Sequence, residues 1–228
     1  MRKIIFLLLF CFAFGLLGFS QAAAFSTLRG LSDQFTFEKS KMNALDDINI
    51  EGSPYLNKEF ILGEIVADDS IRFEKIPLRY NIYSDKIEFK DDKEQILELD
   101  MSRQTYNFKL GNLWFAPLDY LDNGNKKNGI LEVMVEGNIR LYKKYLVDFK
   151  PATKAAGYQD AKPDRFIRMD DEYLIAAGSD MPETVRISKK LFERLKQFKP
   201  DIEQYAKSKG LKIKSESGLI QLIQYCNN

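Results

Sequence analysis

The segment Ile76–Lys90 has the clearest alternation of apolar and polar residues in the chain. Apolar side chains recur at every second position from Leu78 to Ile82 and again from Ile87 to Phe89, and the polar triplet Ser84–Lys86 separates the two runs. A period of two is typical of a strand that buries one face. This segment therefore predicts a β-hairpin, and we expect the rest of the domain to be built outward from it as a meander of strands.

Shorter runs of the same kind, separated by turn residues, predict about ten strands. Besides the hairpin, the expected strands are Glu59–Ala67, Ile71–Phe73, Gln95–Leu99, Thr105–Leu110, Leu113–Phe115, Ile130–Val135, Ile139–Phe149, Arg165–Met169, Tyr173–Ala176 and Thr184–Ile187. No helical pattern lies between them. This excludes a parallel βαβ arrangement and favours an antiparallel curled sheet, sandwich or partial barrel.

Three features of the predicted β region indicate where a strand ends, where a loop lies and where a strand bends. Pro117 is expected to end the strand that begins at Leu113, because proline has no amide hydrogen for the ladder. The polar run Asp122–Gly129 is expected to be a surface loop. The alternation slips near Tyr145, which predicts a bend in the strand Ile139–Phe149.

The apolar period becomes helical towards the C-terminus. Leu191, Leu195 and Phe198 fall on one helical face, Ser188 is a suitable N-cap, and Pro200 breaks the helix. Two further short helical patterns follow, and their apolar stripes need a surface on which to dock. The predicted fold class is therefore mainly β (α+β): an antiparallel meander forming a curled sheet or partial barrel, with two or three short C-terminal helices packed on it.

The N-terminal residues have the composition of a secretory signal peptide. Arg2 and Lys3 precede an apolar run from Ile4 to Leu17, and small residues follow at Ala22–Ala24. The run is shorter than the ~20 residues that span a bilayer, and no later segment approaches that length. We therefore expect export to the periplasm or the outer-membrane periphery, with no transmembrane span after leader cleavage.

These patterns divide the chain into four parts. The expected parts are a signal peptide (1–24), an N-terminal arm (25–51), an antiparallel β domain (52–187) and a helical C-terminal segment (188–228). After cleavage Cys226 is the one remaining cysteine, so no intramolecular disulfide is expected in an oxidising compartment.

The charge of the chain is nearly balanced but unevenly distributed. Loss of Arg2 and Lys3 with the leader changes the formal net charge from +1 to −1, which gives no general attraction to nucleic acid. Carboxylates are concentrated in Asp85–Asp100, and basic residues in Arg186–Lys214. The basic tail could contact an envelope protein, anionic lipid or glycan, or it could be the solvated face of docked helices. Its candidate residues are Lys189, Lys190, Arg194, Lys207, Lys209, Lys212 and Lys214.

Aromatic residues offer a second candidate surface. Five of them could form a stacking platform for sugars, although aromatic residues at strand spacing usually fill cores. They are Trp114, Phe115, Tyr120, Tyr142 and Tyr145. Trp114 and Tyr142 are kept as candidate binding residues.

Several catalytic chemistries are excluded because the chain contains no histidine. This removes Ser-His-Asp and Cys-His systems and histidine-ligated metal sites, and no glycine-rich phosphate loop is present. We therefore expect no catalytic, cofactor-binding or metal-binding residues and no cofactor. The acidic clusters Asp91–Asp92 and Asp170–Glu172 are interpreted as solvated turns. Asp119, Asp122 and nearby asparagines do not match a calcium loop and are also interpreted as loop residues.

Four stretches together resemble a known family. They are GSPYL (Gly52–Leu56), PLRYNIYSDKIEFK (Pro77–Lys90), EGNIRLYKKY (Glu136–Tyr145) and the ending LKIKSESGLIQLIQYCN (Leu211–Asn227). The chain from about residue 50 to 227 resembles a family of uncharacterised exported proteins from Gram-negative bacteria of the Bacteroides group. The resemblance implies envelope residence and a β-rich body with a helical C-terminus, and it implies no activity or catalytic residues.

Three functional hypotheses follow. The leading one is an exported, non-enzymatic binding or scaffolding module of the cell envelope. The second is a carrier of a small apolar or lipid ligand within a β-barrel, which needs an internal cavity of typical ligand size. The third is a carboxylate-based hydrolase, which needs two inward-facing acids in a cleft. Ligand or partner identity and oligomeric state stay open.

Overall fold

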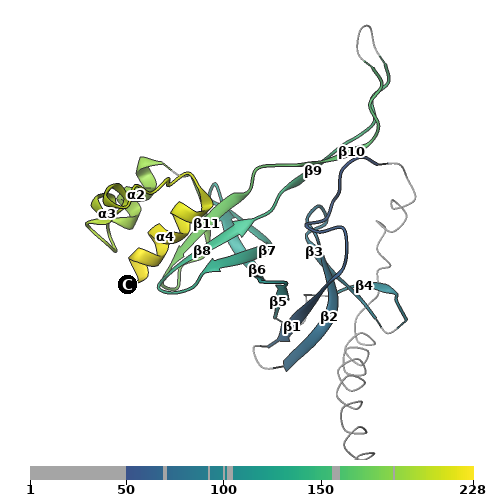
Figure 1. The fold of residues 1–228 in the computed structure, drawn as a ribbon, viewed down its shortest axis with the longest axis horizontal. Coiled ribbons are helices and arrows are strands. Elements are labelled where there is room, and N and C mark those ends of the chain that lie inside the picture. Colours follow the sequence, from purple (N-terminus) through teal and green to yellow (C-terminus); the bar gives the residue numbers. More distant parts are fainter. Residues whose placement is uncertain are drawn as a thin grey trace, which may run out of the picture.

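The computed structural model describes residues 50–68, 71–91, 93–99, 101, 105–155, 160–186 and 188–228. In this part of the chain, twelve strands form a ten-stranded sheet and a separate two-stranded ribbon, and three helices follow at the C-terminal end (Figure 1). The fold class is thus mainly β, as predicted. The expected leader (1–24) and all but the last two residues of the expected arm (25–51) lie outside the described residues.

The elements have the following bounds. The strands are β1 (Ile61–Ala67), β2 (Ile71–Asn81), β3 (Lys86–Lys90), β4 (Ile96–Glu98), β5 (Tyr106–Leu110), β6 (Leu113–Asp122), β7 (Asn125–Val135), β8 (Ile139–Lys144), β9 (Val147–Lys150), β10 (Arg165–Arg168), β11 (Glu172–Ala177) and β12 (Glu183–Val185). The helices are α2 (Lys189–Leu195), α3 (Ile202–Ser208) and α4 (Glu216–Asn227).

Five of the strands close into a small barrel. The large sheet runs β12-β11-β8-β7-β6-β5-β1-β2-β3-β4, and β12 also pairs with β6, in parallel, at Glu183 and Leu121. This pairing closes the ring β6-β7-β8-β11-β12 and makes the sheet mixed. The ring interior is filled by side chains that are at most 6% exposed, namely Tyr120, Leu131, Tyr142, Leu174 and Ala176.

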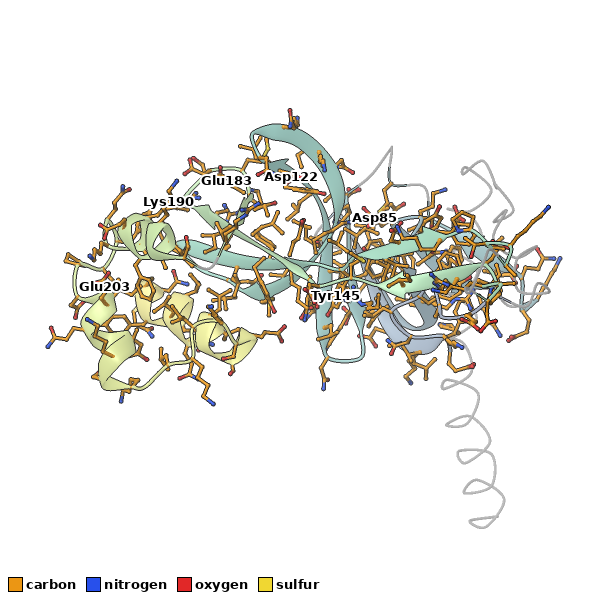
Figure 2. All side chains as sticks on the ribbon, turned by 90° about the horizontal axis from the view of Figure 1, so that it is seen from above. Asp85, Asp122, Tyr145, Glu183, Lys190 and Glu203 are labelled. Carbon is orange, nitrogen blue, oxygen red and sulfur yellow. The ribbon has the colours of Figure 1, made fainter. Side chains whose placement is uncertain are left out.

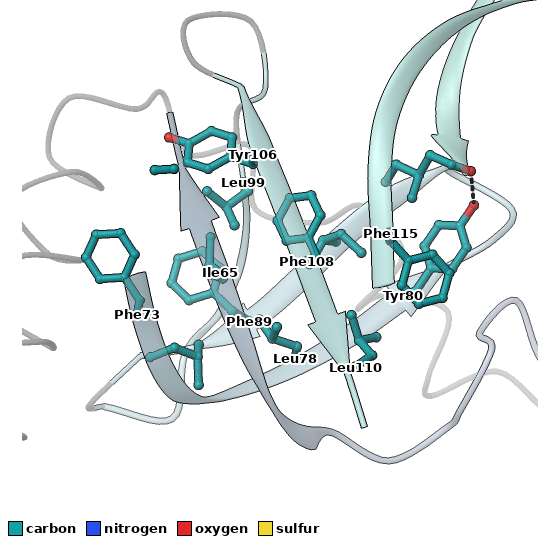
Figure 3. Packing of buried hydrophobic residues seen from close by; sticks show 14 of the residues in the cluster. Ile65, Phe73, Leu78, Tyr80, Phe89, Leu99, Tyr106, Phe108, Leu110 and Phe115 are labelled. Carbon is teal, nitrogen blue, oxygen red and sulfur yellow. Dashed lines mark hydrogen bonds between the residues drawn. The ribbon is translucent and has the colours of Figure 1, made fainter. Parts of the chain in front are cut away.

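The remaining strands curl around a second, larger core (Figure 3). The predicted hairpin Ile76–Lys90 is confirmed as the end of β2 and all of β3, with Leu78 opposite Phe89 and Tyr80 opposite Ile87. Its inward residues pack against those of β1, β5 and β6, including the aromatic pair Tyr80–Phe115 with ring centroids 5.5 Å apart. Such burial of large aromatic and branched side chains supplies the main driving force for folding.

The three helices share one apolar cluster with the barrel: α4 packs on β7 and β8, α3 packs on α4, and α2 packs on α3. Leu195, Ile202 and Leu222, from one helix each, are fully buried in this cluster, which also contains the barrel residues Leu141 and Ile175. At the start of α4, Ser215 accepts a hydrogen bond from the Gly218 N–H and so caps the helix. None of the helices in the described part of the chain has the length and apolar composition of a bilayer-spanning segment.

Charged groups fasten α4 to the barrel. Lys143 Nζ on β8 lies 2.7 Å from Glu216 Oε2, and the Tyr173 hydroxyl donates to the same carboxylate at 3.0 Å. Burial alone would raise the pKa of Glu216, but the hydrogen bond and charge of Lys143 outweigh it and lower that pKa. Glu216 therefore favours the folded state while it is ionised.

The expected end of a strand at Pro117 is wrong. β6 continues through Pro117, which lies opposite Ile130 in β7. The pairing of β5 with β6 stops at Phe115, and β12 joins β6 only at Leu121. Among the described strands, none pairs with this edge of β6 at the proline, which is where a strand tolerates the missing amide hydrogen.

The expected surface loop Asp122–Gly129 is also wrong. β6 reaches Asp122 and β7 starts at Asn125, so Asn123 and Gly124 alone form the turn. Both have positive φ angles, 49° and 81°, which is the conformation that an Asn-Gly hairpin turn requires. The bend predicted near Tyr145 is confirmed, because β9 leaves the sheet there and pairs with β10 in a ribbon that projects from the body (Figure 1).

One carboxylate joins the β2–β3 hairpin to the barrel. Asp85 lies in the turn with a φ of 55°, and its side chain receives the Tyr80 hydroxyl at 2.7 Å, Lys144 Nζ at 2.6 Å and the Ile130 N–H at 3.2 Å. The Lys144 ammonium also donates to the Ile130 carbonyl at 3.3 Å. The pairing of β7 with β8 ends at Glu132. The side chains of Asp85 and Lys144 therefore form hydrogen bonds with backbone groups of Ile130 that β8 does not reach. We call this group the Asp85 cluster.

Gly129 makes room for the cluster. A Cβ atom at this position would lie 2.7 Å from Asp85 Oδ2 and 2.8 Å from Lys144 Nζ. Both distances are shorter than carbon contacts with polar atoms allow, so a larger residue would require the ends of the Asp85 and Lys144 side chains to shift. The glycine that ends the sequence run Asp122–Gly129 is thus used for close approach within a strand rather than for a loop.

The Asp85 cluster makes a stability prediction. Asp85→Asn keeps the shape and tolerates the positive φ, but it leaves Lys144 buried without its counter-charge. We expect a loss of about 2 kcal/mol in the free energy of unfolding, measured by urea denaturation. The control is Asp119→Asn, which removes an exposed ion pair with Lys126 and should cost under about 0.5 kcal/mol. Equal effects of the two substitutions would contradict the role given to Asp85.

The α4 contact predicts a pH dependence. The pKa of Glu216 is lower in the folded chain than its ordinary value of 4.5, so its contribution to stability is present above that pH and is lost as the pH falls through the folded value. Stability measured from about pH 5 to pH 3 should therefore fall more steeply in the wild type than in Glu216→Gln. Glu59→Gln, at an exposed position outside this contact, should leave the slope unchanged. Identical slopes for all three proteins would refute the assignment.

Candidate functional site

A pocket of about 550 Å³ lies where the barrel meets the strands β1, β2 and β5. Its walls combine apolar and polar side chains from both halves of the molecule. We call it the Trp114 pocket, and its lining residues are Val66, Arg72, Asn107, Trp114, Phe115, Val133, Met134 and Glu136. This volume lies within the range of typical small-molecule sites, about 300–1,000 Å³.

Strand register explains why these side chains converge. Residues directly opposite each other in a ladder project from the same face of the sheet. Three such pairs join the pocket residues: Val66 with Asn107, Val66 with Arg72, and Trp114 with Val133. Pairing of Lys109 with Trp114 connects β5 to β6 on this same face. Most of the lining is therefore built on one face of the neighbouring strands β2, β1, β5, β6 and β7, whereas the Phe115 side chain, next to Trp114, is buried in the other core.

The same face leads into the barrel. Along β6, Trp114 shares its side of the strand with Leu118 and Tyr120, which belong to the barrel interior. Val133 packs against that interior and also lines the pocket. The Trp114 pocket thus lies at the mouth of the barrel, and the closely packed interior forms its inner limit.

The polar groups of the pocket are mostly paired within the protein. Arg72 Nη1 lies 2.5 Å from Glu64 Oε1 on the neighbouring strand. Lys109 Nζ lies 5.5 Å from the centre of the Trp114 ring, a distance at which cation and ring attract each other. Glu136 supplies the one carboxylate among the described lining residues. The site combines a flat aromatic wall with charges of both signs.

The structure separates the aromatic candidates. Trp114 and Phe115 line the pocket, and the indole is only partly buried. Tyr120 and Tyr142 lie inside the barrel with exposed fractions of 6% and 4%, so Tyr142 is part of the packed interior and not of an outer surface. Tyr145 is buried and donates its hydroxyl hydrogen to Glu132. A platform of all five aromatic residues therefore does not form.

The basic candidates lie on the helices and the loop before α4, away from the pocket. Figure 2 shows Lys190 at the helical end of the molecule, while Asp85 and Tyr145 lie in its middle. Arg194 is paired with Glu183 at 2.8 Å. Four lysines are exposed and form no ion pair with a described residue: Lys207, Lys209, Lys212 and Lys214. The side chain of Lys189 lies outside the described part.

Buried ionisable groups next to the barrel are occupied with one another. Burial lowers the pKa of Lys144, although Asp85 acts in the opposite direction. Burial and the bond to Glu132 raise the pKa of Tyr145. In the other core, Arg79 donates to Glu88 at 2.6 Å beneath the Tyr55 ring. These groups satisfy each other, which is the usual arrangement of structural buried charges.

The acidic clusters are arranged as turn and hairpin residues. Asp91 Oδ1 accepts the backbone N–H groups of Lys93 and Gln95, while Asp92 lies outside the described residues. Asp171 is paired with Arg168, and Asp122 pairs with Lys127 across the β6–β7 turn. Within the described ranges, no group of three or more Cys, Asp or Glu side chains could hold a metal ion.

In the comparisons with known proteins, no family model, no curated protein and no solved structure matched this chain.

The pocket geometry predicts the behaviour of the single tryptophan. Because the Trp114 ring is half-buried on a pocket wall, acrylamide should quench its fluorescence more strongly than that of a fully buried indole and less strongly than in the unfolded chain. The measurement is a titration of native and urea-unfolded protein. The absence of quenching in the native state would show that the pocket is closed to small molecules.

Proposed function

We propose that this protein is an exported, non-enzymatic binding module that holds a small ligand in the Trp114 pocket. The observation that carries the proposal is the pocket of about 550 Å³ at the mouth of a closed barrel, with the single tryptophan on its wall. Residence in the cell envelope is supported by the basic, apolar and small-residue pattern of residues 1–24. The family resemblance is in agreement with this location.

The position of the pocket distinguishes this proposal from a carrier with an enclosed ligand. The described barrel interior is filled by Tyr120, Tyr142 and their apolar neighbours, so a ligand held by the barrel would lie at its mouth rather than within it. A rigid scaffold with a partly open pocket releases its ligand without a large conformational change. Reversible binding is the activity that this geometry supports best.

The hydrolase alternative has less support from the pocket. Glycoside hydrolysis requires two carboxyl groups facing each other across the substrate. Among the described residues that line the Trp114 pocket, Glu136 is the sole carboxylate. Glu64 lies on the neighbouring strand, where its carboxylate is paired with Arg72.

Ligand binding can be tested by thermal unfolding, since a ligand that binds only the folded chain raises the melting temperature. We expect a screen of neutral saccharides, fatty acids, nucleosides and peptides to give at least one compound that stabilises the wild type. Trp114→Ala should abolish that stabilisation. Met169→Ala removes an exposed apolar side chain that does not line the pocket and should leave the stabilisation intact. The proposal would be refuted if the compound stabilised both variants equally. It would also be refuted if no compound stabilised the wild type or either variant.

A further inference from the structure

The charges around the Trp114 pocket are balanced. The guanidinium of Arg72 is already neutralised by Glu64 at 2.5 Å. Of the remaining charged groups, Glu136 lines the pocket and Lys109 Nζ lies over the face of the tryptophan ring, 5.5 Å from its centre. Two positive and two negative groups create no strong net field, and a fully ionic ligand would compete with pairs that already exist. The pocket is therefore suited to a ligand without net charge.

The shape of the lining groups also indicates which class of uncharged ligand the pocket can bind. The Trp114 indole is a broad, flat, apolar surface, and Val66 and Val133 extend it on the same face of the sheet. The polar members, Arg72 and Asn107 on one side and Glu136 on the other, all end in planar groups with two or more hydrogen-bonding atoms. Planar groups of this kind can bond to two adjacent polar atoms of a ligand at once.

A sugar ring fits both features of this lining, the flat apolar wall and the planar groups that bond to two adjacent polar atoms. One face of a pyranose presents C–H groups that pack on an aromatic ring, while its edge presents adjacent hydroxyl groups that both donate and accept hydrogen bonds. A lipid chain needs instead a continuous apolar channel, and the barrel behind the pocket is filled by Tyr120 and Tyr142. A nucleotide phosphate would compete with Glu64 for the charge of Arg72, whereas neutral hydroxyl groups need only guanidinium N–H groups that do not face Glu64.

We propose that the Trp114 pocket binds neutral saccharide units, with the sugar ring stacked on Trp114 and its hydroxyl groups bonded to Arg72, Asn107 and Glu136. This inference rests on the proposed binding function and names its ligand class. The pocket volume of about 550 Å³ has room for a short oligosaccharide. An open mouth lets such a ligand continue as a longer glycan chain outside the pocket.

The test is isothermal titration of the purified protein with neutral oligosaccharides of several linkages, together with Trp114 emission. An anionic polysaccharide, a fatty acid and a nucleoside serve as the competing classes. We expect at least one neutral oligosaccharide to bind and to change the emission. Trp114→Ala should weaken binding by about tenfold or more, because stacking on the ring is lost. Trp114→Phe should retain part of the affinity, and Met169→Ala all of it.

The outcomes separate this inference from the function on which it rests. Trp114-dependent binding of the fatty acid, the nucleoside or the anionic polysaccharide, without binding of any neutral saccharide, overturns the saccharide assignment and leaves the binding function standing. Saccharide binding that Trp114→Ala does not weaken, or no Trp114-dependent binding of any class, overturns both. Circular dichroism of each variant ensures that a loss of binding is not a loss of fold, and Trp114→Phe provides a second variant if Trp114→Ala unfolds.

Discussion

The arrangement of the barrel and the strands outside it depends on the interactions of one carboxylate, that of Asp85. It lies in the turn of the β2–β3 hairpin, but its partners Ile130 and Lys144 belong to barrel strands β7 and β8. Buried polar groups are costly when they lose a partner, so the backbone of Ile130 and the ammonium of Lys144 both require this carboxylate. These contacts hold the hairpin against the barrel, and Gly129 leaves the Asp85 and Lys144 side chains the room to meet.

This constraint matters because the pocket takes its walls from both halves. Val66, Arg72 and Asn107 come from strands outside the barrel, and Val133 comes from inside the ring. Strand β6 runs through both and carries Trp114 at the point where β5 still pairs with it. A rotation of one half against the other would change the distance between the walls. The contacts of Asp85 therefore help to fix the separation of the pocket walls, which would limit the reorganisation that the proposed ligand binding costs.

The fold could be predicted largely from local patterns, and the errors have local physical causes. The Ile76–Lys90 hairpin and the C-terminal helices follow from apolar periods that need no knowledge of distant partners. Pro117 was misinterpreted because its tolerance depends on which edge of β6 is unpaired, and that is decided by β5 and β12. The turn at Asn123–Gly124 had a sequence signal, the Asn-Gly dipeptide, that the many polar neighbours concealed.

The candidate site was harder to predict than the fold. Trp114 was chosen because of its residue type, but the same reasoning also chose Tyr142, whose place inside the barrel depends on ring closure by β12. Val66, Asn107 and Val133 have no signal of their own, since they meet only through the register of three separate strand pairs. Asp85 resembled a solvated turn residue because its partners lie 45 and 59 positions further along the chain.

Residue-resolved hydrogen exchange of the Ile130 amide tests the central claim most directly. If Asp85 accepts a hydrogen bond from this N–H where the hairpin meets the barrel, the Ile130 amide exchanges as slowly as that of its neighbour in the barrel core, Leu131. Asp85→Asn should then accelerate exchange of the Ile130 amide and leave that of Leu131 unchanged. An Ile130 amide that exchanges as fast as the Asn123–Gly124 turn in the wild type would show that the carboxylate does not join the two halves.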